Sequence, residues 1–285
     1  MEEIVHALIH AVEDTVKLLP LLFLTYLLME YLEHHSGSKL SRVLGAAKKN
    51  GPLYGSLFGL IPQCGFAGAA ANLYAGGAIT VGTLLAVFLA TSDEMLPILV
   101  STRMPVEKIL LILGVKLLCG VLVGFLADWV NRRRHRHRDV DIHDFCSREN
   151  CSCEGGIWMS ALRHTVKIGL VILLAVAVLN VVFAFIPQQK VAQFCNIPVL
   201  GELLMTLIGL MPNCAASVLV TDLYAQGVIL AGPMFAGLLA NAGVGLLVLF
   251  RVNRKVRENL LIVAVLSVSA VLLGTLLGVV FHGLL

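Results

Sequence analysis

The sequence repeats itself at a fixed spacing. Shifted by 150 residues, the chain aligns with itself without a gap, and Gly59-Leu60-Ile61-Pro62-Gln63-Cys64 falls on Gly209-Leu210-Met211-Pro212-Asn213-Cys214. Between 59–90 and 209–240, 13 of 32 positions are identical. Leucine, alanine and glycine matches are common in an apolar sequence, whereas coincident proline and cysteine are not. The chain is therefore a duplication, and its fold must contain one structural unit twice.

The composition excludes an ordinary soluble protein. Of the 285 residues, 58% are hydrophobic and 14% are charged, whereas soluble domains are about 45–50% apolar and about 25% charged. The net charge of +3 is too small to indicate a nucleic-acid partner. No basic segment precedes the first apolar run, so we expect no cleaved signal peptide. The seven cysteines follow no extracellular pattern, and we expect them to be mostly reduced.

Each half contains four apolar segments, three of which reach the length of about 20 residues that spans a bilayer. The remaining segment of each half, 51–75 or 201–225, is interrupted at Pro62 or Pro212. Each arm of the interrupted segments is about half a bilayer long, at about 1.5 Å per residue. The sequence therefore predicts an all-α polytopic membrane protein of two inverted repeats, each with three spanning helices and a re-entrant, broken helical hairpin. The expected segments are 4–32, 51–75, 77–100, 106–130, 160–185, 201–225, 227–250 and 258–284.

The basic residues select this topology over a plain crossing of the interrupted segments. If these segments re-enter, loops 33–50, 131–159 and 251–257 share one side, and with Arg163 they hold 15 of the 21 Lys and Arg residues. Basic loops face the cytoplasm. We therefore expect a multi-pass protein of the cell (inner or plasma) membrane with both termini external. Its parts are a first transmembrane repeat over 1–130, a cytoplasmic His/Cys/Arg-rich linker over 131–159 and a second transmembrane repeat over 160–285.

Paired broken helices in inverted repeats are typical of secondary transporters, which bind substrate near the membrane midplane. Each cysteine of the two breaks is expected to open the inner arm of its hairpin, where a helix N-terminus favours negative charge and lowers a thiol pKa. Thiols and amide oxygens suit a thiophilic metal or metalloid, and the site would equally suit a small anion. The alternative is that the cysteines are small packing residues. The predicted substrate-binding residues are Pro62, Gln63, Cys64, Pro212, Asn213 and Cys214.

A second candidate site lies in the third segment, where Asp93 and Glu94 interrupt an apolar run. Ionisable groups inside a membrane are costly and mark pathways or proton relays. Thr91 lies just before this acidic pair, and its repeat mate in the second half is Asn241. The candidates for binding a coupling proton or a cation are therefore Asp93, Glu94 and Asn241. The alternative is that the carboxylates lie at the outer mouth near Arg103 and are merely solvated.

The central linker carries His, Cys and carboxylate residues after a run of arginines. This density indicates a metal-loading segment, although Cys-Ser-Cys at 151–153 lacks the usual zinc-finger spacing. The alternative is a solvated basic loop in which these residues are incidental. The candidate linker ligands are His135, His137, His143, Cys146, Cys151 and Cys153.

The paired Gly-Leu-x-Pro-x-Cys breaks, the two similar halves and the His/Cys-rich linker resemble the ten-segment heavy-metal exporters. That family is also labelled arsenic efflux proteins or manganese transporters. The resemblance covers almost the whole chain, and counting the hairpin arms separately gives ten segments. It implies export of a metal or metalloid and supplies no established ligand residue.

Three functions stay open. The first is efflux of a thiophilic metal or metalloid such as arsenic. The second is export of a divalent cation such as Mn²⁺, which prefers oxygen and nitrogen ligands and would leave both cysteines idle. The third is a membrane thiol oxidoreductase using Cys64 and Cys214, which would lack a Cys-x-x-Cys motif.

The sequence also bears on energy source and partners. No Gly-x₄-Gly-Lys-Ser/Thr motif is present, so an ion gradient or facilitated diffusion is expected instead of ATP. We expect no enzyme activity and no cofactor, with a metal ion bound only as substrate. The expected partners are the lipid bilayer and a small inorganic ion or metalloid, without nucleic acid and with a homodimer as an open alternative.

Overall fold

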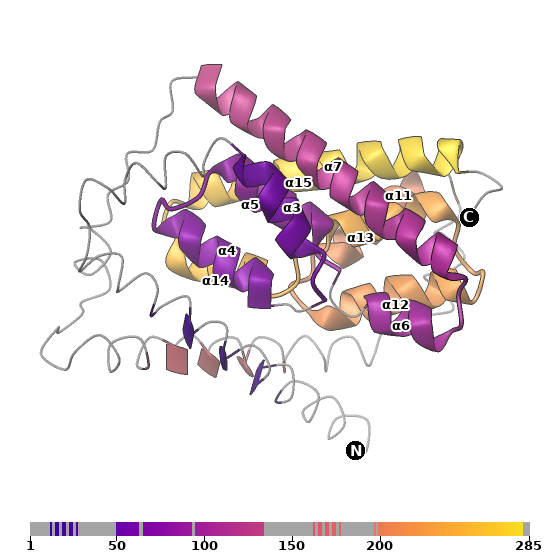
Figure 1. Cartoon of the computed structure of the whole chain (residues 1–285), viewed down its shortest axis with the longest axis horizontal. Helices are drawn as coiled ribbons and strands as arrows, with labels where there is room; N and C mark the ends of the chain where they lie inside the picture. The colour runs from indigo at the N-terminus through magenta and orange to yellow at the C-terminus, as the bar shows by residue number, and fades with distance from the viewer. Residues whose placement is uncertain are drawn as a thin grey trace, which may run out of the picture.

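The computed structural model describes residues 12, 15–16, 19–20, 23–24, 27, 50–62, 65–92, 95–133, 162, 165–166, 169–170, 173–174, 177, 197 and 199–281. Within these ranges the regular structure is helical and contains no strand (Figure 1). Helices suit a chain of this hydropathy because they satisfy their backbone N–H and C=O groups within one segment. The longer elements are α3 (Gly51–Gly59), α4 (Gly65–Ala75), α5 (Val81–Ala90), α6 (Met95–Ser101), α7 (Val106–Arg133), α11 (Leu200–Gly209), α12 (Cys214–Ala225), α13 (Ala231–Ala240), α14 (Gly245–Val252) and α15 (Val256–Val280).

The repeated sequence produces repeated elements. Shifting the first-half helices α3 to α7 by 150 residues places each on a helix of the second half, α11 to α15, with starts that agree to within a residue. The helix ends are also alike, because Gly77 and Gly227 both have positive φ, at 76° and 71°. Glycine adopts this backbone readily, and it closes α4 and α12 with the same turn. The duplication therefore holds for the backbone as well as for the sequence.

Within each half, one central helix packs between two neighbours. α5 contacts α3 and α7, and α13 contacts α11 and α15. A Cβ atom on Gly59 would lie 2.7 Å from the carbonyl oxygen of Val87, and one on Gly209 would lie 2.2 Å from that of Gly237. These two contacts occupy the same positions of the repeat. Small residues that let helix backbones touch are typical of packing between membrane helices.

A short helix of each half packs against a short helix of the other half. α4 packs against α14, and α12 packs against α6; Figure 1 shows the two pairs at opposite ends of the molecule. A Cβ atom on Gly245, at the start of α14, would lie 2.8 Å from Ala67 Cβ of α4. Each half is therefore completed by a helix of the other half.

The interruptions expected at Pro62 and Pro212 are present as gaps between helices. α3 ends at Gly59 and α4 begins at Gly65, while α11 ends at Gly209 and α12 begins at Cys214. Proline removes a backbone donor and clashes with the preceding turn, so a helix does not continue through it.

A further break appears where the sequence predicted one continuous segment in each half. In the segment expected over 77–100, α5 ends at Ala90 and α6 begins at Met95. In the segment expected over 227–250, α13 ends at Ala240 and α14 begins at Gly245. Each of these expected spans therefore consists of two short helices, and each remains long and apolar enough to cross a membrane. In the second half the cause of the break is local: Gly243 has φ 51°, and its N–H donates to Asn241 Oδ1 at 3.1 Å, so the chain turns out of the helix.

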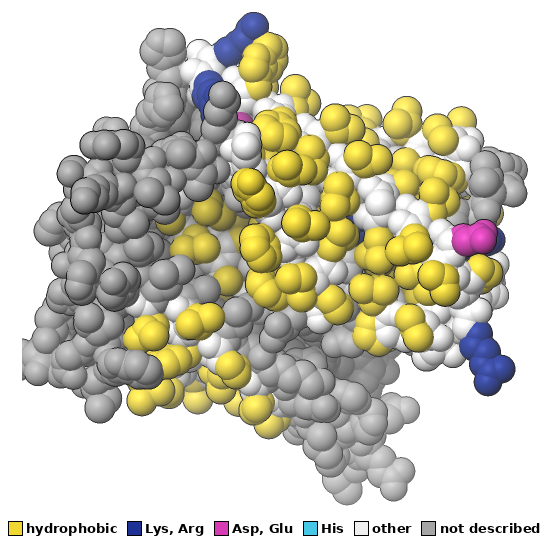
Figure 2. Space-filling view, viewed as in Figure 1, with side chains coloured by type: hydrophobic (Ala, Val, Ile, Leu, Met, Phe, Trp, Pro, Cys, Tyr) yellow, Lys and Arg dark blue, Asp and Glu magenta, His cyan; other side chains and the backbone are white. Residues whose placement is uncertain are grey.

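Four stretches of the described chain are long and apolar enough to cross a membrane: 81–101, 106–133, 231–252 and 256–280. Their outer faces are apolar, as at the repeat mates Leu122 and Leu272, which are 66% and 63% exposed. In Figure 2, hydrophobic side chains cover most of the described face, and charged side chains lie near its edges. Such a surface requires hydrocarbon around it.

The long helices α7 and α15 run in opposite directions along the molecule. In Figure 1, α7 ends at the upper left, whereas α15 begins at the left and ends at the right. The end of α7 carries Arg132 and Arg133, and the connection from α14 to α15 carries Arg254 and Lys255. Two strongly basic segments therefore lie toward the same end of the molecule.

Candidate functional site

Buried polar side chains accumulate at the helix breaks and beside them. Thr91 and Ser92 follow α5, Asn241 follows α13, and each is at most 2% exposed. At the start of α12, Asn213 and Ser217 are each 1% exposed. Burying a polar group in apolar surroundings is costly unless it is hydrogen-bonded. The helix breaks are therefore among the places where polar side chains are buried in the bundle.

Lys116 lies at the centre of this arrangement. It belongs to the long helix α7 and is 0% exposed. Its Nζ donates hydrogen bonds to the carbonyl oxygen of Thr91 and, at 2.9 Å, to that of Leu238. Thr91 is the C-cap residue of α5, and Leu238 lies in the last turn of α13. Carbonyl groups at the C-terminal end of a helix lack partners within the helix, and a cation is stabilised there. One ammonium group therefore holds together the ends of α5 and α13.

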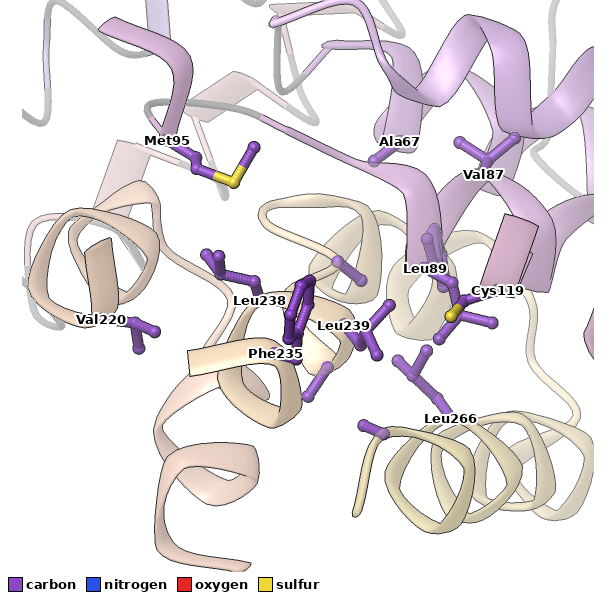
Figure 3. Close-up of a cluster of buried hydrophobic side chains, with 14 of the residues drawn as sticks. Ala67, Val87, Leu89, Met95, Cys119, Val220, Phe235, Leu238, Leu239 and Leu266 are labelled. Carbon is purple, nitrogen blue, oxygen red and sulfur yellow. The ribbon is translucent and has the colours of Figure 1, made fainter. Parts of the chain in front are cut away.

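The hydroxyl groups at the first break satisfy the end of α5. Thr91 Oγ1 donates to the Val87 carbonyl oxygen at 2.7 Å, and Ser92 Oγ donates to that of Ala90 at 3.0 Å. Figure 3 shows the apolar surroundings, with Leu238 and Leu239 of α13 between Met95 on one side and Cys119 on the other. Thr91, Ser92 and Lys116 therefore hold the C-terminal end of α5 in place at the first break.

The second hairpin uses its amide as a helix cap. Asn213 has extended backbone geometry, and its Oδ1 accepts a hydrogen bond from the Ala215 N–H at 3.3 Å. Asparagine is among the best residues at this position. Cys214 is the first residue of α12. The amide oxygen predicted to bind substrate is therefore engaged with a helix N-terminus.

The remaining predicted residues fall in different places. Pro62 is exposed and Pro212 is half-buried at the two hairpin breaks. Asn241 is buried at the second break and accepts from the Gly243 N–H. The residues outside the described part of the chain are Gln63, Cys64, the side chain of Cys214, Asp93, Glu94, His135, His137, His143, Cys146, Cys151 and Cys153.

No three His, Cys, Asp or Glu side chains come close enough to hold a metal ion within the described ranges. The described ranges include neither the thiols of the two hairpins nor the linker, and the predicted sulfur ligands lie there. Lys116 was not among the site residues predicted from the sequence, although an ionisable residue within an apolar helix is a recognisable signal of function. Two buried carboxylates, Asp128 and Glu202, were not predicted either.

These features together define a polytopic membrane protein: apolar helices long enough to span a bilayer, small-residue packing and buried polar groups at paired breaks. Residues 5–200 match the family described as 10TM heavy-metal exporters, so the chain belongs to that family. No curated protein and no solved structure matches the chain.

Proposed function

We propose that the protein is a secondary transporter that exports a thiophilic metal or metalloid, such as arsenic, through the cell membrane. The observation that carries the proposal is the pair of helix ends held by Lys116, one from each half of the duplication. Paired discontinuous helices form the binding sites of secondary transporters, because their ends present backbone dipoles to an ion. The family's name for heavy-metal export supports the substrate class.

The proposed topology is a pair of inverted repeats with three crossings and one re-entrant hairpin each. The opposite directions of α7 and α15 support this inversion. The hairpin arm α3 has 9 residues and α11 has 10, and at about 1.5 Å per residue each reaches roughly half of a bilayer. The basic end that carries Arg133 and Lys255 faces the cytoplasm, as the positive-inside rule requires.

The proposed substrate site joins the two hairpin tips near the midplane. Pro62, Gln63 and Cys64 come from the first tip, and Pro212, Asn213 and Cys214 from the second. Sulfur ligands favour a thiophilic substrate over Mn²⁺. The neighbouring breaks supply Asp93, Glu94 and Asn241 for a coupling ion, and the linker thiols load substrate from the cytoplasm.

The decisive experiment replaces both hairpin cysteines. Arsenite uptake into inverted vesicles would be measured for Cys64→Ser, Cys214→Ser and the double variant, with Cys119→Ser as the matched control. Cys119 is a buried cysteine of α7 outside the proposed site. Each single hairpin variant should lose most of the flux, and the double should lose little more, because residues acting as a unit are non-additive. Full flux in the double variant would refute a thiol site and favour a cation such as Mn²⁺.

A further inference from the structure

The connection between α14 and α15 carries a cluster of exposed basic side chains. Its members, all within 251–257, are Arg251, Arg254, Lys255 and Arg257. The equivalent connection of the first half, 101–107, provides an internal comparison. Its residues at the corresponding positions are Ser101, Met104, Pro105 and Glu107. The basic cluster therefore belongs to one half of the duplication and is no requirement of the repeated fold.

Three of these basic residues line a pocket at the start of α15. The described residues around this pocket of about 570 Å³ are Arg254, Lys255, Val256, Arg257, Glu258 and Leu261. Such a volume is typical of small-molecule sites, which measure about 300–1,000 Å³. Glu258 Oε1 lies 3.4 Å from Lys255 Nζ. Three cations and one carboxylate leave this lining with a net charge of +2, so the pocket favours an anion.

Two buried asparagines hold the turn that carries the pocket. Asn253 is 3% exposed and Asn259 is 0% exposed, and each side-chain amide donates a hydrogen bond to the other residue. Their repeat mates are Arg103 and Ile109, which cannot form this pair. The positive-inside rule requires only that basic residues lie near the membrane. A turn fixed by buried hydrogen bonds goes beyond that requirement, because it holds the charges in place for a ligand.

An apolar wall adjoins the basic lining. Val256 and Leu261 belong to the pocket and are 56% and 50% exposed. The exposed residues Val268 and Leu272 follow Leu261 at spacings of seven and four residues, so they lie on the same face of α15. This helix is long and apolar enough to cross a membrane, and the pocket lies at its first turn, where lipid headgroups are found. A soluble anion needs no apolar wall, whereas a phospholipid has a phosphate followed by hydrocarbon chains.

We propose that the pocket at the start of α15 binds the headgroup of an anionic phospholipid, with an acyl chain along the exposed face of that helix. The guanidinium groups of Arg254 and Arg257 bind the phosphate, because a planar guanidinium donates two parallel hydrogen bonds to it. In the proposed orientation the site faces the cytoplasmic leaflet, whose anionic lipids attract basic clusters beside membrane helices. This lipid site goes beyond the proposed transport function and does not depend on the transported substrate.

Lipid binding to the purified full-length protein tests the site. Native mass spectrometry in detergent would measure the dissociation constant of dioleoylphosphatidylglycerol, with zwitterionic dioleoylphosphatidylcholine as the comparison. We expect the anionic lipid to bind more tightly, and Arg254→Gln and Arg257→Gln should each weaken its binding about fivefold. The matched control is Arg251→Gln, which removes a charge from the same connection outside the pocket and should have a smaller effect. Equal losses in all three variants would indicate diffuse attraction to a basic surface and overturn the proposal.

A soluble phosphate separates a lipid from a free anion. Glycerol 3-phosphate carries the phosphate without acyl chains and should compete for the pocket much more weakly than the lipid. Leu261→Ala should weaken binding of the lipid and leave that of glycerol 3-phosphate unchanged. Equal affinity for the two compounds would overturn the proposal and assign the pocket to a soluble anion.

Thermal unfolding shows whether the bound lipid acts on the folded protein. Dioleoylphosphatidylglycerol should raise the unfolding midpoint of the wild type and of Arg251→Gln, because a ligand of the folded state stabilises it. The double variant Arg254→Gln with Arg257→Gln should lose this rise, and an undiminished rise would contradict the site. If that variant fails to fold, the wild type decides: equal binding of the anionic and zwitterionic lipids would overturn the proposal.

Discussion

Lys116 Nζ donates a hydrogen bond to the carbonyl oxygen of Leu238, a residue 122 positions later in the chain, at 2.9 Å. The same nitrogen donates to Thr91, so one side chain connects a break in the first half with a helix of the second. The repeat mate of Lys116 is Leu266, which is also fully buried. The duplication is therefore asymmetric at this position.

Replacing Lys116 by Met should destabilise the protein by about 2–4 kcal/mol, because two buried carbonyl groups lose their donor while the side-chain volume is kept. Thermal unfolding in detergent would measure the loss, and Lys116→Arg should recover part of it. The control is Leu266→Met, a hydrophobic exchange that should cost less than about 1.5 kcal/mol. Equal stability of the Lys116→Met and Leu266→Met proteins would contradict the structure.

Replacing Asp128 by Ala should cost about 1–3 kcal/mol, because the Gly82 N–H and the Thr80 hydroxyl lose their acceptor at the start of α5. Thr80→Val should cost less, since the Gly82 bond survives. Unfolding midpoints of the two variants and of their double would show non-additive losses. Additive losses would mean that Thr80 and Asp128 do not act together.

The turn between α14 and α15 depends on two asparagines. Asn253 Nδ2 donates to Asn259 Oδ1 at 2.6 Å, and Asn259 Nδ2 donates to the Asn253 carbonyl oxygen at 2.8 Å. Asn259→Ala should therefore cost about 1–3 kcal/mol, because it removes both buried hydrogen bonds that Asn259 makes with Asn253. Asn259→Asp, which keeps an acceptor and removes the donor, should separate the two bonds. A neutral Asn259→Ala variant would refute this pairing.

Glycine contacts between helices offer a test with an internal control. A Cβ atom on Gly209 would lie 2.2 Å from a backbone oxygen, whereas a Cβ atom on Gly114 would meet nothing within 4 Å. Gly209→Ala should reduce stability and folded yield. Gly114→Ala should be neutral, or stabilising by about 0.5–1 kcal/mol through helix propensity. Similar behaviour of the two variants would show that α11 and α13 are not in close contact.

The proposed orientation is testable at two described connections. Single cysteines at 103 and 254 would be introduced into a variant that lacks exposed native thiols. An impermeant maleimide added to intact cells should label position 103 and spare position 254, which should react only after permeabilisation. The reverse pattern would mean that the basic end faces outward, contrary to the positive-inside rule.

The duplication and the helix interruptions at Pro62 and Pro212 could be predicted from the sequence, because proline acts locally and the repeat is exact in spacing. The breaks after Ala90 and Ala240 were missed, since apolar length alone does not distinguish a continuous helix from two short ones. Aligning the halves could not predict that Asp128 approaches the start of α5 and Glu202 the start of α13, because the two carboxylates come from helices that do not correspond, α7 and α11. This likeness appears only in three dimensions.

The packing of α4 against α14, a helix of the other half, has a consequence for the biogenesis of the protein. α4 ends at Ala75, and its packing partner α14 begins at Gly245, about 170 residues later. At synthesis rates of about 5–20 residues per second, α4 waits roughly 10–30 s for its partner to emerge from the ribosome. During that interval its contact face, rich in alanine and glycine, needs lipid or an insertion chaperone as a temporary neighbour. A truncated chain that stops before α14 should therefore be a substrate for membrane quality control instead of a half-sized transporter.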